Sequence, residues 1–203
     1  ELAVRYETRG ELLLATISAR NTGAEQQWLE VGPEVLLGAT TLSVFDGRDR
    51  AETPQEEFGS DEFMGWLPFI AAWDRSASFG VGMAASELRS WFGRRYLPAE
   101  GRGSLRSVTR LVLDPGQEDR VTFFLSARPA DWEQFEILQA YYESAPERFR
   151  PAEGVDERIT RRGGAQYRAW SGDSEFAGEI SRRLMGGWDW AYAPFRRTGD
   201  IYG

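Results

Sequence analysis

The chain contains no cysteine and no histidine. Without cysteine it has neither a disulfide nor a thiolate nucleophile, and without histidine it has no Ser-His-Asp triad and no imidazole base. The usual zinc ligands are missing as well. Any acid–base chemistry must therefore use Asp, Glu or Tyr, and we expect neither a metal nor a cofactor. The lack of cysteine fits either redox compartment, so the localisation stays open.

Basic residues are fewer than acidic ones and are all of one kind. All 24 basic residues are arginines, and 32 acidic residues bring the net charge to -8. Because there is no basic excess to neutralise phosphates, we expect no nucleic-acid partner. The sequence also lacks an apolar run of about 18 residues, so we expect no transmembrane helix and no membrane partner.

Aromatic residues, in contrast, are abundant. They form 13% of the 203 residues and include eight tryptophans. This composition is far from that of a disordered chain. The length suits one domain, or one domain followed by the beginning of another, and it is sufficient to bury a core.

The first half of the chain reads as short strands separated by turns. Leu2, Val4 and Tyr6 alternate with polar neighbours, which predicts a half-buried strand. A polar, acidic stretch at 47–62 predicts a surface loop. Further strands are expected at 11–21, 28–31, 34–38, 41–45, 66–73, 79–85, 105–113 and 118–127. Strands at this spacing, without helices between them, predict an antiparallel β-sandwich over residues 1–128.

The pattern changes after residue 128. Asp131 is a plausible N-cap, and apolar residues at helical spacing follow it, so we expect one amphipathic helix. Residues 147–168 are polar and Arg-rich and read as a linker, and 174–185 predict a second helix. Together these features indicate a helical linker region over 129–182.

Three local patterns have competing readings. GVGMAA (80–85) matches a variant of the dinucleotide fingerprint, but its flanks favour glycines within a β-hairpin. Asp46 and Asp49 offer oxygen ligands for calcium, but such a pair is also typical of a solvated turn. The tryptophans of the expected sandwich can stack against sugar rings or fill the core. Trp73 lies within an apolar run and is expected in the core, whereas Trp66, after an acidic loop, suits a rim.

The tail MGGWDWAYAPFRRTGDIYG is the segment richest in aromatic and charged residues. Trp188, Trp190 and Tyr192 alternate and would face one side of a strand, with Asp189 on the other. At the end of a barrel strand these residues suit a sugar-binding wall, although packing of the tryptophans against barrel helices explains the pattern equally well. We expect residues 183–203 to begin a second, truncated domain.

The order of these elements resembles that of the melibiase-type α-galactosidases and related glycoside hydrolases. ARNTG (19–23), WLPFIAAWDRSASFGVGM (66–83), the stretch from LDPGQ to LQAYY (113–142) and GGWDWAY (186–192) are similar to segments of those enzymes. The resemblance implies an N-terminal β-supersandwich, a linker helix and the first strand of a (β/α)₈ barrel. Those enzymes typically carry Trp-x-Ser-Trp on that strand, where this chain has Trp188-Asp189-Trp190.

The resemblance also implies a function for a longer protein, namely hydrolysis of O-glycosyl bonds. The catalytic carboxylates of such enzymes lie on later barrel strands, so we expect no catalytic residue in this chain and an inactive fragment. Its expected partner is a carbohydrate substrate, contacted by Trp188, Asp189 and Trp190 and by Trp66 from a sandwich loop. A non-catalytic carbohydrate-binding module or a structural sandwich is the alternative, and a homo-oligomer is possible in either case.

Overall fold

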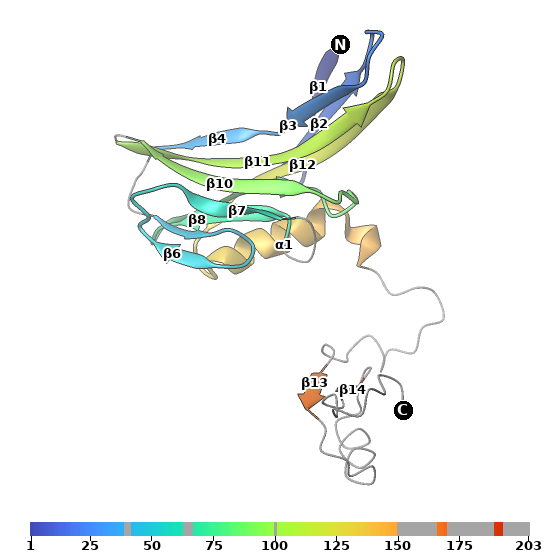
Figure 1. Cartoon of the computed structure of the whole chain (residues 1–203). Helices are drawn as coiled ribbons and strands as arrows, with labels where there is room; N and C mark the ends of the chain where they lie inside the picture. The colour runs from blue at the N-terminus through green and yellow to red at the C-terminus, as the bar shows by residue number, and fades with distance from the viewer. Residues whose placement is uncertain (39–41, 63–66, 100, 150–165, 170–188, 193–203) are drawn as a thin grey trace. The chain divides into compact units, whose positions relative to one another are not determined.

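A computed structural model of the chain describes residues 1–38, 42–62, 67–99, 101–149, 166–169 and 189–192 (Figure 1). The chain forms two compact units, Glu1–Phe149 and Arg150–Gly203, and each is described by itself. The expected three-part division at 1–128, 129–182 and 183–203 stays a prediction.

The larger sheet of the first unit contains seven antiparallel strands in the order β1-β2-β12-β9-β8-β5-β6. Neighbours such as β2 and β12 pair over nine residues, from Leu12 opposite Ser126 to Arg20 opposite Glu118. The strands are β1 (Leu2–Arg9), β2 (Leu12–Arg20), β5 (Ser43–Phe45), β6 (Arg50–Glu52), β8 (Phe69–Trp73), β9 (Ala77–Met83) and β12 (Glu118–Pro129).

The smaller sheet contains five strands, ordered β3-β11-β10-β7, and β4 also pairs with β11. Its strands are β3 (Gln27–Val31), β4 (Glu34–Leu37), β7 (Phe58–Glu62), β10 (Phe92–Ala99) and β11 (Arg102–Leu113). All pairs in this sheet are antiparallel as well.

The two sheets share a hydrophobic core. One cluster joins Ile17 and Phe123 of the larger sheet to Leu111 of the smaller sheet, and a second joins Ile70 to Leu105. The other face of the larger sheet is covered by the helix α1 (Gln134–Ser144), which runs across it in Figure 1. Because central strands of the larger sheet are covered on both faces, they read as continuous apolar runs such as FIAAW.

Close packing of α1 depends on glycine. Ile137 and Ala140 of α1 are fully buried against Leu14 and Phe124. A Cβ added at Gly80 would lie 2.2 Å from the Ile137 Cγ2. The GVGMAA segment therefore belongs to the β8–β9 hairpin, which confirms the hairpin reading over the dinucleotide reading. Its first glycine, Gly80, leaves room for Ile137 of α1.

The mainly β prediction is confirmed, with two antiparallel sheets and one α-helix among the described residues. The expected turn at 114–117 is present, with the Gln117 N–H donating to the Asp114 carbonyl at 2.9 Å. The helix is also confirmed, but Asp131 is not its N-cap. The N-cap is Glu133, whose side chain makes no capping hydrogen bond.

The prediction of a plain surface loop at 47–62 is wrong in part, because β6 and β7 lie within it. Their polar composition follows from their place at sheet edges. Glu57 and Asp61 form ion pairs at 2.6 and 2.9 Å with Arg95 of β10, a strand that the periodicity did not indicate. Acidic residues that read as a loop are thus cross-strand partners of a cation.

The prediction that β1 is half-buried is also wrong. All eight of its residues are exposed, including Leu2, Val4 and Tyr6. Val4 pairs with Ile17 of β2, whose side chain enters the core, so the apolar face of β1 continues the core face of the sheet. As the edge strand, β1 lies beyond what the second sheet covers.

In the second unit the structure describes β13 (Gln166–Ala169) and β14 (Asp189–Tyr192). They pair in parallel, with Tyr167 opposite Trp190. The strand expected in the tail is present as β14, whereas β13 lies partly in the stretch that we read as a linker. A barrel is not shown by these eight residues, and the expected helix at 174–185 lies outside the described residues.

Candidate functional site

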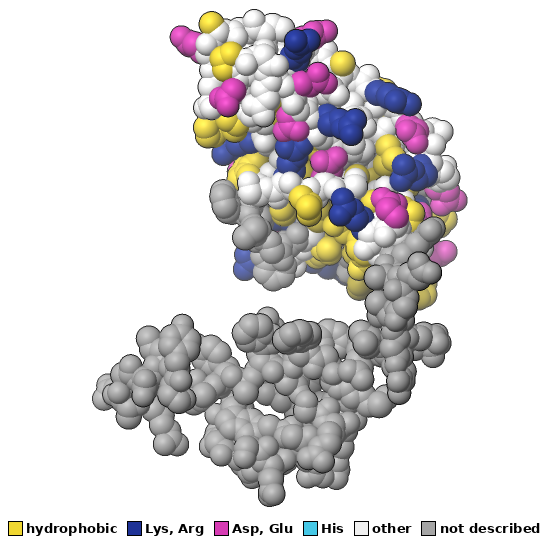
Figure 2. Space-filling view, turned by 90° about the vertical axis from the view of Figure 1, so that its right-hand side faces the viewer, with side chains coloured by type: hydrophobic (Ala, Val, Ile, Leu, Met, Phe, Trp, Pro, Cys, Tyr) yellow, Lys and Arg dark blue, Asp and Glu magenta, His cyan; other side chains and the backbone are white. Residues whose placement is uncertain are grey.

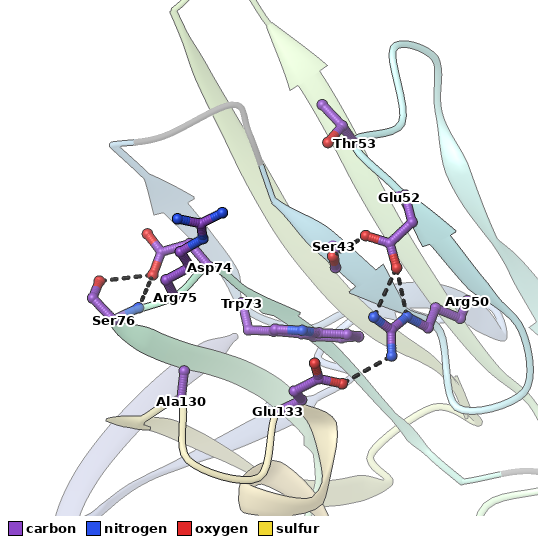
Figure 3. Close-up of a pocket in the computed structure, with 10 residues that line it drawn as sticks. All are labelled: Ser43, Arg50, Glu52, Thr53, Trp73, Asp74, Arg75, Ser76, Ala130 and Glu133. Carbon is purple, nitrogen blue, oxygen red and sulfur yellow. Dashed lines mark hydrogen bonds and ion pairs between the residues drawn. The ribbon is translucent and has the colours of Figure 1, made fainter.

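A pocket of about 950 Å³ opens at one end of the larger sheet (Figure 3). It is built from three segments far apart in the sequence: the β5–β6 hairpin, the β8–β9 turn and the chain just before α1. Its lining residues are Ser43, Arg50, Glu52, Thr53, Trp73, Asp74, Arg75, Ser76, Ala130 and Glu133.

Trp73 lies among the charged residues of this pocket. In Figure 3, Asp74 and Ser76 lie on one side of the indole, and Arg50 and Glu52 on the other. The Arg50 guanidinium carbon is 4.9 Å from the ring centroid, a cation–π distance. Only 4% of Trp73 is exposed, which confirms its expected place in the core. It can serve as an apolar floor, but it cannot offer a free face for a sugar to stack on.

Arg50 holds two carboxylates at the pocket wall. Its Nε and Nη2 each lie 2.7 Å from Glu52 Oε1, and its Nη1 lies 2.8 Å from Glu133 Oε2. The Ser43 hydroxyl also donates to the Glu52 carboxylate. The hydrogen bond from Ser43, followed by that from Arg50, lowers the pKa of Glu52. Glu52 is therefore ionised at neutral pH and unsuited to act as a general acid.

Asp74 organises the opposite wall. Its Oδ1 accepts hydrogen bonds from the Ser76 N–H and the Ser76 hydroxyl, both at 2.7 Å, and from the Ala77 N–H at 2.9 Å. These bonds lower the pKa of Asp74, the hydroxyl of Ser76 having the largest effect. Asp74 closes the turn predicted at 74–76, and its carboxylate is held in place before any ligand arrives.

Backbone strain gathers at the same pocket. Of the residues that the structure describes, two non-glycine residues have positive φ, Thr53 at 45° and Glu133 at 54°, and both line the pocket. Such a conformation costs about 1–3 kcal/mol and persists where the surrounding structure requires it. Thr53 is β-branched, which makes its conformation still less favourable. Strain of this kind is typical of functional sites.

The chemistry that these residues allow is binding. Carboxylates, a guanidinium and hydroxyls around an apolar floor suit a polyhydroxylated ligand, because planar polar groups pair with sugar hydroxyls. Glycoside hydrolysis needs one carboxylic acid that is protonated and one free carboxylate. Here Glu52 and Glu133 are both ion-paired to Arg50. Among the described lining residues, these two carboxylates are thus engaged by Arg50.

The Asp46 turn differs from the expected solvated turn. Asp46 is only 3% exposed. Its Oδ1 accepts the N–H groups of Arg48 and Asp49 at 3.0 and 2.8 Å, and its Oδ2 accepts the Ser60 hydroxyl at 2.9 Å. Ser60 in turn accepts a bond from the fully buried Arg94 at 2.8 Å. This carboxylate is used to join the turn to β7.

The described residues that line this pocket are other than the site residues expected from the sequence. Trp66 and Trp188 lie outside the described residues, and Asp189 and Trp190 lie in β14, opposite Gln166 and Tyr167. Their assignment to a substrate wall stays a prediction. The pocket residues were missed because Arg50 and Glu52 stood in a stretch read as a loop, and the sequence offers no signal that brings them to residue 133.

Charge elsewhere is mixed. On the face shown in Figure 2, arginines and acidic residues are interspersed over the described part of the first unit. Among the described residues, no three Asp or Glu side chains are grouped as metal ligands would be. Within the same residues, no helix has the length and apolar character needed to cross a membrane.

Comparison with known proteins gives a fold likeness. No family model and no curated protein matches the chain. The α-galactosidase from Lactobacillus brevis aligns with 70% of this chain and 23% of its own, at 14% identity and a TM-score of 0.51. The Slr1438 protein from Synechocystis sp. PCC 6803 aligns with 62% of this chain and 54% of its own, at 13% identity and a TM-score of 0.40.

A TPR-domain containing protein from Parabacteroides distasonis ATCC 8503 aligns with 62% of this chain and 30% of its own, at 11% identity and a TM-score of 0.39. This chain therefore spans between 23% and 54% of the length of these three solved structures. The likeness to the α-galactosidase concerns the fold of a part of that enzyme.

Proposed function

We propose that residues 1–149 form the accessory β-sandwich of a glycoside hydrolase of the α-galactosidase type. The observation that carries the proposal is the fold likeness to the Lactobacillus brevis α-galactosidase over 70% of this chain. Two antiparallel sheets, then α1, then a parallel strand pair also follow the order implied by the family resemblance. A parallel pair needs a crossover connection, as the strands of a (β/α)₈ barrel do.

In this proposal the hydrolysis of O-glycosyl bonds belongs to a longer protein of which this chain is a part. Trp66, Trp188, Asp189 and Trp190 contribute to the wall of its substrate pocket. The test is hydrolysis of aryl α-galactosides, with a wider panel of aryl glycosides beside them. The longer protein is expected to turn over at least one substrate and the 203-residue chain none. A longer protein inactive on the whole panel would contradict the proposal.

The second candidate is a carbohydrate-binding module without catalysis. The pocket favours it, because its ion-paired carboxylates, its strained backbone and its apolar floor are suited to binding. This second candidate has one consequence for the chain, which is weak sugar binding at the pocket around Arg50. We expect a dissociation constant of about 1 mM, typical of few polar contacts in an open site.

Binding can be tested on the 203-residue chain by calorimetry or ligand-observed NMR with galactose, melibiose and raffinose. R50Q removes the guanidinium and is expected to weaken binding by about fivefold or more. R106Q is the matched control, since Arg106 is an equally exposed arginine that pairs with Glu30 at 3.0 Å on the other sheet. Equal binding by both variants would place any sugar contact elsewhere. No binding by the unaltered chain would leave the pocket with a structural role.

A further inference from the structure

Among the described strands, one edge of the larger sheet has no partner. β1 is the end strand of that sheet, and no described strand pairs with its outer side. The Arg20 N–H donates to the Glu1 carbonyl at 2.9 Å, and the Glu1 amino group donates to the Arg20 carbonyl at 2.9 Å. Hydrogen-bonded pairs recur at every second residue of an antiparallel ladder. The odd-numbered residues of β1 therefore bond to β2, and the backbone groups of the even-numbered residues point outward.

The side chains on this edge separate into an apolar and a charged row. Leu2, Val4 and Tyr6 are 61%, 47% and 64% exposed and lie on the face that continues the core. Arg5 and Glu7 are exposed on the opposite face. An exposed edge with a contiguous apolar row is a template for pairing with a further strand.

We propose that two copies of this chain associate through β1, in an antiparallel pair that joins their larger sheets. In the register that places Tyr6 opposite its own copy, Arg5 of each chain lies opposite Glu7 of the other. Val4 lies opposite Thr8, and both are among the residues whose backbone groups point outward. In this register the outward backbone groups of both strands can be hydrogen-bonded, and two Arg5–Glu7 pairs lie across the contact.

Neighbouring registers are less favourable. When one strand slides by two residues relative to the other, the even-numbered residues still form the hydrogen bonds. In one direction this slide places Arg5 opposite Arg5, and in the other it places Glu7 opposite Glu7. When one strand slides by a single residue, Leu2, Val4 and Tyr6 of one copy lie on the same face as Arg5 and Glu7 of the other copy. Opposite charges that face each other stabilise a strand pair and like charges destabilise it, so the sequence of β1 selects the Tyr6-centred register.

The occupant that fits this edge is a second copy because β1 is complementary to itself. A C2 dimer requires such self-complementarity, since each residue of the contact meets the symmetry mate of its partner. The contact is one strand wide, which places it at the small end of stable interfaces. We therefore expect a dissociation constant of about 10–100 μM.

Sedimentation equilibrium of the 203-residue chain tests the association. R5E and E7R each set like charges against each other, and each is expected to weaken the dimer by about tenfold. The double variant R5E/E7R restores opposite charges and is expected to recover the affinity. An equimolar mixture of the two single variants should form a heterodimer tighter than either homodimer. R102E, a charge reversal at the start of β11, is the control and should leave the affinity unchanged.

Two further variants report on the edge and the register. V4P removes an outward N–H while the bonds to β2 remain, and it should abolish the dimer with the circular dichroism spectrum unchanged. Because the chain has no cysteine, Y6C introduces a single thiol that should form a disulfide-linked dimer on mild oxidation, since facing residues lie about 5.5 Å apart. L2C, away from the symmetric position, should cross-link far more slowly.

Several results would overturn the proposal. One is a chain that stays monomeric up to about 500 μM, well above the expected dissociation constant. Another is a dimer that R5E, E7R and V4P leave unchanged, which would place the contact on another surface. Cross-linking of L2C as fast as that of Y6C would refute the register.

Discussion

Glu133 offers a direct test of the strain at the pocket. Its φ of 54° and ψ of -127° are the angles of the first central residue of a type II′ turn, and the Phe135 N–H donates to the Trp132 carbonyl at 3.0 Å, as that turn requires. Glycine dominates this position because a Cβ disfavours a positive φ. A glutamate here is held against its local preference, while its carboxylate pairs with Arg50.

The prediction compares E133G with E133A. Both variants lose the ion pair with Arg50, which is worth about 0.2–1 kcal/mol, since its side chains are 42% and 46% exposed. Only E133G also relieves the positive φ. We therefore expect E133G to be more stable than E133A by about 1 kcal/mol or more, despite the greater freedom of glycine in the unfolded chain. This corresponds to about 2–4 °C in the melting temperature.

The assay is urea or thermal unfolding of the 203-residue chain, followed by circular dichroism. Q139A and Q139G are the matched pair, since Gln139 is exposed within α1. There alanine should be the more stable by about 0.8–1 kcal/mol, the reverse of the order at residue 133. An E133A variant as stable as E133G would refute the strain argument. If E133G binds sugars more weakly than E133A, which lacks the same carboxylate, the strain serves the pocket.

Two further predictions concern the packing of α1 and the acid sensitivity of the fold. G80A should destabilise the chain by about 1–3 kcal/mol, because the added Cβ would meet Ile137. In a double-mutant cycle measured by urea unfolding, I137A should recover part of that loss. Additive effects of the two substitutions would contradict the contact. Two hydrogen bonds from the Arg89 guanidinium, at 2.6 and 3.0 Å, lower the pKa of Asp119. The pair therefore stabilises the folded state fully above the unfolded pKa of about 3.9. This stabilisation is lost as the pH falls through the lower pKa of the folded state. D119N should therefore cost about 1 kcal/mol at pH 7 and progressively less below about pH 4, and a cost that is the same at pH 7 and pH 2.5 would exclude this linkage.

The local patterns of the sequence predicted the elements whose cause is local. Alternation and apolar runs predicted β2, β8, β11 and β12. A strand with one covered face alternates apolar and polar residues, and a strand covered on both faces is apolar throughout, so both kinds can be recognised in the sequence. Pro115 and Gly116 predicted the turn between the last two strands, because their backbone preferences match a β-turn. The spacing after Pro129 predicted α1. Trp73 was expected in the core because every neighbour in its run is apolar.

Only the tertiary structure decided the rest. Leu2, Val4 and Tyr6 have the pattern of a covered strand, but burial depends on what packs above a strand, and β1 is the end strand of the described sheet. Asp46 read as solvated and is buried, because Ser60 supplies a partner from another strand.

The pocket depends in the same way on contacts between distant residues. Glu133 meets Arg50 from 83 positions away, and no period or motif encodes such a meeting. It arises when the closing of α1 over the larger sheet brings the helix N-terminus beside the β5–β6 hairpin. The sequence by itself therefore determined most of the strands, the helix and the core position of Trp73, because these follow from local preferences and from hydrophobicity. The site depended on which elements became neighbours, and that was decided by packing.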